Sequence, residues 1–293
     1  MLRNRLWMGS LLALMAAGVL VLDHWFAPWY PFLFACLLGF GALAGRELIA
    51  LFSPPHRPPA GVFLPALLVL LAANWLTAAP GLVPPGPGAW QVLVLVFVAG
   101  MLALFLAEMA RFREPGTTTL RTAVGVWGVA YIGLPASCVA QLRWLGAESG
   151  HGGGAEWWSL PLAIVFFVPK AGDVGAYVAG RLFGRTPFSP RLSPKKTWEG
   201  AAGGFAAAVA TMLVLLYAGG GMAVGWAPAL LFGAAVAVAA QLGDLAESMV
   251  KRDGHVKDSA HTLPGFGGVL DVIDSILFAA PVVYAGCLLL GVR

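Results

Sequence analysis

QLGDLAESMVKRDGHVKDSAHTLPGFGGVLDVIDS, from Gln241 to Ser275, is the stretch of this chain that stands out from the rest. It holds six acidic residues and three lysine or arginine residues, although charged residues make up only 11% of the sequence. An apolar run rich in Ala and Val precedes it, and another apolar run follows it to Gly291. Charge at this density between two apolar runs indicates either a chemical site or a loop fixed by membrane topology.

Composition places the whole chain in a membrane. Of its 293 residues, 59% are hydrophobic, and the mean hydropathy is +0.81. A soluble domain is closer to half apolar and carries about a quarter charged residues. We therefore predict an all-α integral membrane protein, in which Cys36, Cys138 and Cys287 are packing residues because each lies in an apolar run without CxxC or Cys/His spacing.

About 20 consecutive apolar residues are needed for a helix to cross a bilayer, and the sequence predicts nine such spans. The first has the basic start and apolar centre of a signal peptide, but the many spans after it favour a retained helix. The predicted spans are 6–22, 30–51, 61–79, 90–110, 122–142, 157–180, 201–218, 226–246 and 269–291.

The distribution of basic residues predicts the orientation of these spans. With the N-terminus in the cytoplasm, fifteen of the 18 Lys and Arg residues lie on the cytoplasmic side, two lie outside, and Lys170 lies within a span. This excess is the positive-inside signal. It predicts that the C-terminus lies outside and that two polar loops, 181–200 and 247–268, share the cytoplasmic face.

The first polar block, Lys170 to Gly184, lies inside a predicted span. On a helix Asp173, Tyr177 and Gly180 fall on one stripe. Lys170 and Asp173, three residues apart, could neutralise each other. Alternatively, Asp173 binds a substrate or a metal ion, and the sequence leaves both interpretations open.

The second block, SPRLSPKKTWEG, begins at Ser189. Ser193 is a good helix N-cap residue and Pro194 suits the first helical position, so we predict that Lys195, Lys196 and Thr197 lie in the first turn. Lysines there oppose the helix dipole, which is explained if a polyphosphate binds at the helix start. The alternative is an anchor for anionic lipid head groups.

The third block is the opening stretch itself. Asp244, Glu247 and Lys251 lie on one helical face at the end of a span, and Asp271 and Asp274 share a face at the start of the next. Carboxylate oxygens are ligands of Mg²⁺ beside substrate phosphates. Acids at a helix N-terminus could also simply favour the dipole.

Other chemistries lack support in the sequence. His255 and His261 do not have a zinc spacing, and we expect them to face solvent. No Ser/His/Asp arrangement, Walker A motif or GxGxxG motif is present.

Taken together, GDVGAYVAGRLFG, SPKKTWEG, QLGDLAESMVKR and KDSAHTLPGFGGVLDVIDS resemble the phosphatidate cytidylyltransferases, or CDP-diacylglycerol synthases. The resemblance covers about residues 165–285, with several motifs in the same order and spacing. The chain departs from the family pattern at Phe266, where a histidine is usual, and at Val272, where an arginine is usual. The resemblance implies a single polytopic membrane domain, residues 1–293. Residues 1–150 would form N-terminal helices of low motif content, and residues 157–291 would form the catalytic helices and cytoplasmic loops.

The resemblance implies transfer of the cytidylyl group of CTP to phosphatidic acid, which gives CDP-diacylglycerol and pyrophosphate. We expect Asp244, Asp271 and Lys251 to be catalytic. The expected metal ligands are Asp244, Asp271 and Asp274, with Asp258 and Asp173 as further candidates. The expected contacts to CTP or pyrophosphate are Lys195, Lys196 and Lys251, with Ser193, Thr197 and Glu199 shaping the nucleotide pocket and Arg252 or Lys257 holding the lipid phosphate.

We expect Mg²⁺ as the cofactor, and a second, monovalent cation could share the site. The expected partners are CTP, phosphatidic acid and membrane lipids, without nucleic acid, and a homodimer could form. The expected location is the bacterial inner membrane, with the active site on the cytoplasmic face.

Three other classes of protein stay open at this point. A CTP-dependent polyprenol kinase would release CDP instead of pyrophosphate. A transporter could use Lys170 and Asp173 as a translocation pair, although no internal repeat is visible. A scaffold protein would bind no CTP.

Overall fold

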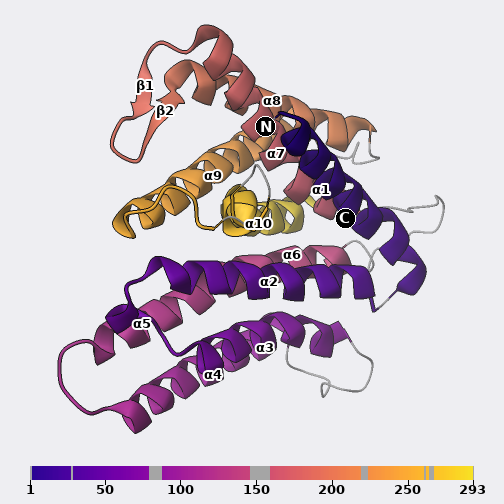
Figure 1. Cartoon of the computed structure of the whole chain (residues 1–293). Helices are drawn as coiled ribbons and strands as arrows, with labels where there is room; N and C mark the ends of the chain where they lie inside the picture. The colour runs from indigo at the N-terminus through magenta and orange to yellow at the C-terminus, as the bar shows by residue number, and fades with distance from the viewer. Residues whose placement is uncertain are drawn as a thin grey trace. The chain divides into compact units, whose positions relative to one another are not determined.

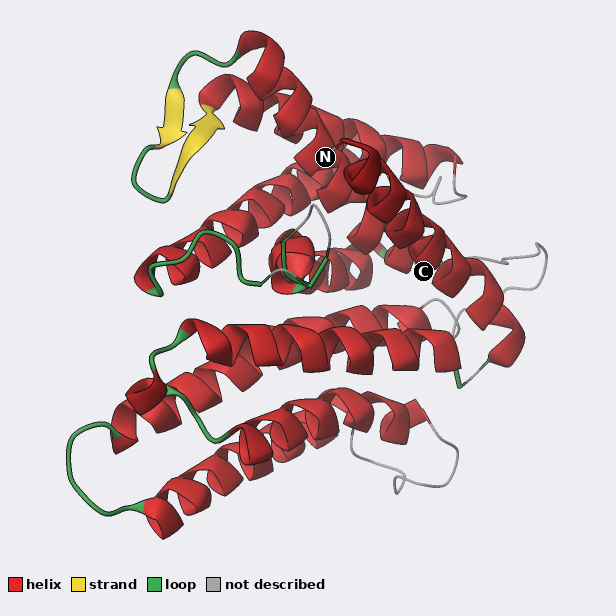
Figure 2. Ribbon diagram, viewed as in Figure 1, coloured by secondary structure: helices red, strands yellow, loops and turns green. Residues whose placement is uncertain are grey.

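A computed structural model describes residues 2–27, 29–78, 88–145, 159–218, 224–260, 262–263 and 267–292. Within these residues the chain is almost entirely helical, and one two-stranded hairpin is its sheet structure (Figure 2). The prediction of an all-α membrane protein is confirmed. Cys36, Cys138 and Cys287 are free thiols, of which Cys138 and Cys287 are buried.

Among the residues that the structure describes, eight helical segments are long and apolar enough to cross a membrane, so the chain is a multi-pass membrane protein. The remaining predicted span, 61–79, contains a shorter apolar helix, Ala60–Leu76, within α3 (Ala60–Ala78). The number of crossings and the orientation of the termini stay predictions. The eight segments include α1 (Leu2–Leu22), α2 (Pro31–Leu51), α4 (Ala89–Arg111), α7 (Leu160–Phe183), α8 (Trp198–Ala218), α9 (Trp226–Asp253) and α10 (Leu270–Leu290), and a continuous stretch made of α5 (Thr118–Gly128), the π-helical turn Val129–Gly133 and α6 (Leu134–Leu145).

The helices form two compact units (Figure 1). The first comprises Met1–Ala140 and Asp258–Leu270, and the second comprises Gln141–Lys257 and Asp271–Arg293. The sequence predicts that the whole chain is one polytopic membrane domain, and this organisation stays a prediction.

The first unit is built around α3. Phe63, Leu67 and Leu70 of this helix are fully buried. Asn74, also buried, donates a hydrogen bond from Nδ2 to Oγ of Ser137 on α6 at 3.0 Å. A polar pair of this kind fixes the register between two apolar helices, because each group would otherwise be buried without a partner.

The start of α2 is capped from the preceding turn. Asp23 is fully buried, and its carboxylate accepts the N–H groups of Phe32 at 2.9 Å and Leu33 at 2.7 Å. The first N–H groups of a helix have no intrahelical partner, and a carboxylate at that end also complements the helix dipole. This cap joins the first residue of the 3₁₀ turn Asp23–Phe26 to the first turn of α2.

In the second unit, α7 and α8 pack with their backbones close together. A Cβ atom built on Gly204 would lie 2.8 Å from the carbonyl oxygen of Gly172, so α8 could not carry a larger residue at this position without moving away from α7. Small residues permit this approach in membrane helices. The loop between the two helices forms the hairpin of β1 (Pro187–Ser189) and β2 (Ser193–Thr197), which is antiparallel (Figure 1).

The hairpin corrects one prediction. Ser193 does not cap a helix, and Lys195 and Lys196 do not lie in a first helical turn, because Ser193–Thr197 is a strand paired with β1. The cap is Thr197 instead, whose Oγ1 accepts the N–H of Gly200 at 3.1 Å. The lysines therefore precede the helix, and the argument that they oppose its dipole does not apply.

Candidate active site

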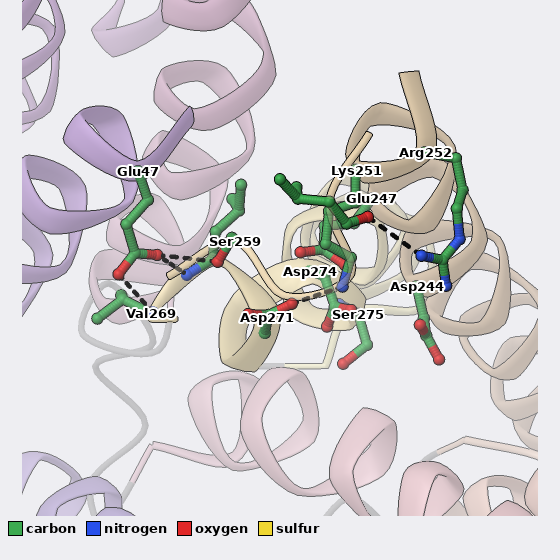
Figure 3. A network of polar contacts seen from close by, with 12 residues as sticks. Glu47, Asp244, Glu247, Lys251, Arg252, Ser259, Val269, Asp271, Asp274 and Ser275 are labelled. Atoms are coloured by element: carbon green, nitrogen blue, oxygen red, sulfur yellow. Dashed lines mark hydrogen bonds and ion pairs between the residues drawn. The ribbon is translucent and has the colours of Figure 1, made fainter. Parts of the chain in front are cut away.

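Three carboxylates from α9 and α10 gather in the second unit. Asp244, Glu247 and Asp274 each place one oxygen so that all three atoms lie within 4.8 Å of one another (Figure 3). Asp244 is partly exposed, whereas Glu247 and Asp274 are buried. Asp244 and Asp274 belong to the expected set of ligands, whereas Glu247 takes the place expected for Asp271; three carboxylate oxygens so placed suit a hard divalent cation.

The absence of a side chain at Gly243 lets α9 and α10 approach closely enough to form this cluster. A Cβ atom there would lie 2.5 Å from the carbonyl oxygen of Asp274 and 2.9 Å from Cβ of Phe278. Any larger residue would separate the helices by part of an ångström or more. Gly243 directly precedes Asp244, so the contact lies next to the carboxylates themselves.

One buried lysine lies among the acids. Lys251 forms an ion pair with Glu247, one turn before it on α9, and its Nζ lies 2.5 Å from Oδ1 of Asp271 on α10. The ammonium group links the two helices and offsets part of the negative charge. Asp271 is therefore paired with the ammonium group of Lys251. Glu247, and not Asp271, completes the group of three carboxylates with Asp244 and Asp274.

Glu247 is the most deeply buried of the acids, with 0% of its surface exposed. Apart from the ion pair with Lys251, its carboxylate oxygens lack a hydrogen-bond partner within the described residues. Buried carboxylates are normally paired or bound to a metal ion. The residues present therefore fit a divalent cation.

A pocket of about 440 Å³ lies beside the carboxylates, between α7, α8, α9 and the hairpin. Lys195 and Lys196 line it, and Nζ of Lys196 lies 2.6 Å from Oδ2 of Asp244, which also lines it. Residues of loop 181–200 and of α9 therefore meet at this pocket, while the shared cytoplasmic face of loops 181–200 and 247–268 stays a prediction. The pocket thus brings two lysines beside a carboxylate of the cluster.

Lys170 and Asp173 pair within α7, with Nζ 2.8 Å from Oδ2. The same Nζ lies 2.9 Å from Oγ of Ser275 on α10, and that hydroxyl lies 3.2 Å from Asp173. Ser275 also donates its N–H to Oδ1 of Asp274 at 2.5 Å. The intramembrane pair is therefore attached to the carboxylate cluster, and Asp173 lines the pocket.

The model of the cytidylyltransferase family matches residues 3–290. The chain belongs to this family. The match includes the apolar N-terminal helices, which the motifs alone, from about residue 165, did not reach.

Named relatives agree with this membership. Over 160 residues, 54% of each chain, the sequence is 40% identical to the phosphatidate cytidylyltransferase of Brucella suis biovar 1. Over 123 residues it is 41% identical to that of Haemophilus influenzae, covering 41% of this chain and 43% of the relative. Over 231 residues it is 33% identical to that of Mycobacterium bovis, covering 75% and 70%. The chain spans about half the length of the first two relatives.

Some predicted residues of this cytidylyltransferase-family chain have structural partners. Glu199 accepts hydrogen bonds from the N–H groups of Arg185, at 3.1 Å, and Thr186, at 3.2 Å, so it fixes the turn before β1. Thr197 caps α8 and also lines the pocket. Ser193 pairs with Ser189 in the hairpin and is not among the residues that line the pocket.

The remaining predicted residues lie in or near the loop after α9. Arg252 donates to the carbonyl oxygens of Leu192 and Val256, both at 3.1 Å, so it links this helix end to the hairpin. Lys257 and Asp258 are exposed, and Asp258 belongs to the first unit, outside the carboxylate cluster of the second. Their roles stay predictions.

The two histidines and the two departures from the family pattern can be placed only in part. His255 is exposed, as predicted, and Val272 lies half-buried in the first turn of α10. His261 and Phe266 lie outside the described residues.

Two residues were missed as site residues. Glu247 was recognised only as part of a polar face, although its spacing of three from Asp244 and four from Lys251 was visible. Ser275 follows Asp274 directly, and nothing in the sequence indicated that its hydroxyl contacts Lys170 across 105 residues.

Proposed function

We propose that this chain transfers the cytidylyl group of CTP to phosphatidic acid and releases pyrophosphate. The observation that carries the proposal is the 2.6 Å contact between Lys196, which lines the pocket, and Asp244, which belongs to the carboxylate cluster. A phosphate-binding cation and a metal-binding acid therefore share one site. The names of the relatives support the choice of substrates.

The pocket lysines are suited to the CTP phosphates. Lys195 is exposed and Lys196 is half-buried. Both lie on strand β2, so neither ammonium group lies in a first helical turn, where the helix dipole would oppose it. When CTP binds, Lys196 would exchange its bond to Asp244 for a charge-assisted bond to phosphate. Asp244 would then be released for cation binding.

Asp244, Glu247 and Asp274 would hold Mg²⁺. When bound, the ion supplies positive charge that neutralises the CTP phosphates and the leaving pyrophosphate. Lys251 would keep Asp271 in place and limit the repulsion among the acids. A monovalent cation that shares the site belongs to the proposal as well.

The reaction needs little proton transfer. The phosphate of phosphatidic acid is already an anionic nucleophile, so one of its oxygens can attack the α-phosphorus of CTP without a protein base. The new P–O bond forms as the bond from the α-phosphorus to the bridging oxygen of pyrophosphate breaks. The protein then contributes mainly positioning and charge neutralisation, with Lys195 and Lys196 on the nucleotide and Arg252 or Lys257 on the lipid phosphate.

The proposal includes a location and an assembly. The bacterial relatives and the excess of basic residues in alternate loops support an inner-membrane enzyme with its active site on the cytoplasmic face. A homodimer is also part of the proposal.

The test is an assay of the detergent-purified protein with phosphatidic acid and CTP labelled at the α- or the γ-phosphorus. We expect α-label in the lipid and γ-label in pyrophosphate. Label from the γ-phosphorus in the lipid, with CDP released, would identify a kinase and overturn the proposal.

The same assay tests the acids. Asp271→Asn should lower turnover by at least about 100-fold, because the ion pair that holds Lys251 and α10 together would be lost. Asp253→Asn, an exposed acid at the end of α9, is the matched control and should retain wild-type turnover. Normal turnover by Asp271→Asn in correctly inserted protein would refute the assignment of Asp271 to the active site.

A further inference from the structure

The carboxylate of Glu47, on α2 of the first unit, receives hydrogen bonds at both of its oxygens (Figure 3). Oε1 accepts from the hydroxyl of Thr262 at 2.7 Å and the N–H of Val269 at 2.9 Å. Oε2 accepts from the N–H of Leu270 at 2.8 Å and the hydroxyl of Ser259 at 3.2 Å. Glu47 is only 6% exposed, so four donors replace the water that it has lost.

Two of these donors lie at the start of α10. The N–H groups of Val269 and Leu270 are among those that a helix start leaves without an intrahelical partner. A carboxylate in that place also complements the positive end of the helix dipole. Glu47 therefore acts as an N-terminal cap supplied from a residue more than 220 positions earlier in the chain.

The other two donors lie before the helix. Ser259 and Thr262 precede a short bridge in which Leu263 and Gly267 exchange two backbone hydrogen bonds, at 2.8 and 3.1 Å. The carboxylate of Glu47 thus accepts hydrogen bonds from donors before the helix, Ser259 and Thr262, and from donors at its start, Val269 and Leu270. Gly268 lies against the carboxylate, and a Cβ atom built there would run into Glu47 and Ser259.

Leu270 is followed directly by Asp271, and Asp274 lies one turn later on the same helix. A cap on the first N–H groups fixes the axial position and the rotation at which the helix begins. We propose that Glu47 is a positioning residue for the reaction: it sets the start of α10 and so the placement of Asp271 and Asp274. This inference rests on the proposed function, in which those two acids serve the cation and Lys251.

The test compares Glu47→Gln with Glu108→Gln. Both remove one buried carboxylate of the first unit by a near-isosteric change, but the partner of Glu108 is Arg121 of α5, whose Nη2 lies 2.8 Å from Oε2. The first measurement is hydrogen–deuterium exchange of peptides that cover residues 267–276. The second is equilibrium binding of Mn²⁺, a spectroscopic probe for Mg²⁺, to the purified protein.

Glu47→Gln should accelerate exchange at the start of α10 at least tenfold and weaken Mn²⁺ binding about tenfold, since an amide nitrogen cannot accept the bonds that Oε1 or Oε2 accepts. In turnover, kcat should fall while KM for CTP stays within about twofold, because Glu47 does not touch the nucleotide pocket. Glu108→Gln should change none of these. Gly268→Ala, which displaces the same carboxylate by crowding, should reproduce the effects of Glu47→Gln.

Wild-type exchange in Glu47→Gln would overturn the cap. Accelerated exchange with unchanged Mn²⁺ affinity would overturn the positioning role. If the wild type makes no CDP-diacylglycerol, the proposed function fails, and the exchange and Mn²⁺ measurements still decide the inference about Glu47.

Discussion

Glu247→Gln is the substitution for which the site makes the most specific prediction. Its carboxylate lies within 4.8 Å of those of Asp244 and Asp274. At an effective dielectric constant of about 20, two unit charges at that distance repel by about 3.5 kcal/mol, so Glu247 when ionised meets about 7 kcal/mol of repulsion from the pair. Its ion pair with Lys251, at an ordinary separation of about 2.8 Å, returns about 6 kcal/mol.

The two contributions are of similar size, and burial of the carboxylate and the nearby Asp271 add further cost to ionised Glu247 in the absence of a divalent cation. Replacing Glu247 with glutamine should therefore leave the metal-free protein as stable as the wild type, or more stable by about 1 kcal/mol. That is unusual for a fully buried charged residue, whose removal from an ion pair normally costs about 3–5 kcal/mol.

Binding of Mg²⁺ should make the wild type more stable than Glu247→Gln. A ligand at 100 times its Kd stabilises the folded state by about 2.7 kcal/mol, and the wild type should gain this while the glutamine variant gains little. Thermal unfolding in detergent, followed by the fluorescence of the 11 tryptophans, measures both states in EDTA and across a Mg²⁺ titration.

The control is Glu108→Gln, which removes a buried carboxylate from an ion pair with Arg121 far from the cluster in sequence. It should unfold at a lower temperature in both conditions and keep the full response to Mg²⁺. If Glu247→Gln is destabilised in EDTA by more than about 2 kcal/mol, or responds to Mg²⁺ like the wild type, Glu247 is not part of a cation site.

Two further predictions concern the pocket and the helix contact. Lys196→Gln should raise KM for CTP about tenfold, the equivalent of about 1.4 kcal/mol in phosphate binding, while Lys196→Arg should keep most of the affinity. Steady-state kinetics measure KM for both variants. An unchanged KM in Lys196→Gln would show that Lys196 is not part of the nucleotide site. Gly243→Ala should destabilise the protein by about 1–3 kcal/mol through overpacking against α10 and lower Mg²⁺-dependent turnover. Gly233→Ala, on the same helix, would place its Cβ 3.1 Å from Cβ of Met212 on α8, a less severe contact than the 2.5 Å at Gly243, and should do neither to the same degree; equal losses in the two variants would mean that the contact at Gly243 has no special role.

The membrane class and the two helix ends that carry acids could be predicted from the sequence, because both depend on local composition and spacing. Asp271 and Asp274 are three residues apart, and any helix places them on one face. The start of α8 was predicted wrongly for a local reason as well. Ser193 and Thr197 are both acceptable caps, and pairing of Ser193–Thr197 with β1 decided between them.

Contacts between distant segments were beyond sequence reasoning. The bond from Lys170 to Ser275 joins α7 to α10, and nothing near either residue marks it. Glu47, next to Arg46 near the end of a hydrophobic helix, has the pattern of an ordinary charged helix end. Its role depends on four donors that lie more than 200 residues away.

Two of the buried glutamates show why the donors around a charge matter more than its burial. Glu47 and Glu247 both lie in helices and both are almost fully covered. Glu47 accepts four hydrogen bonds, which satisfy its oxygens, so a cation would have to displace bonds that hold α10. Glu247 has the ion pair with Lys251 and no hydrogen bond within the described residues, and two other carboxylates face it. A satisfied carboxylate stabilises structure, whereas an unsatisfied one beside like charges is stabilised by a bound cation. The same residue type therefore anchors the helix at one place and is suited to bind metal at the other.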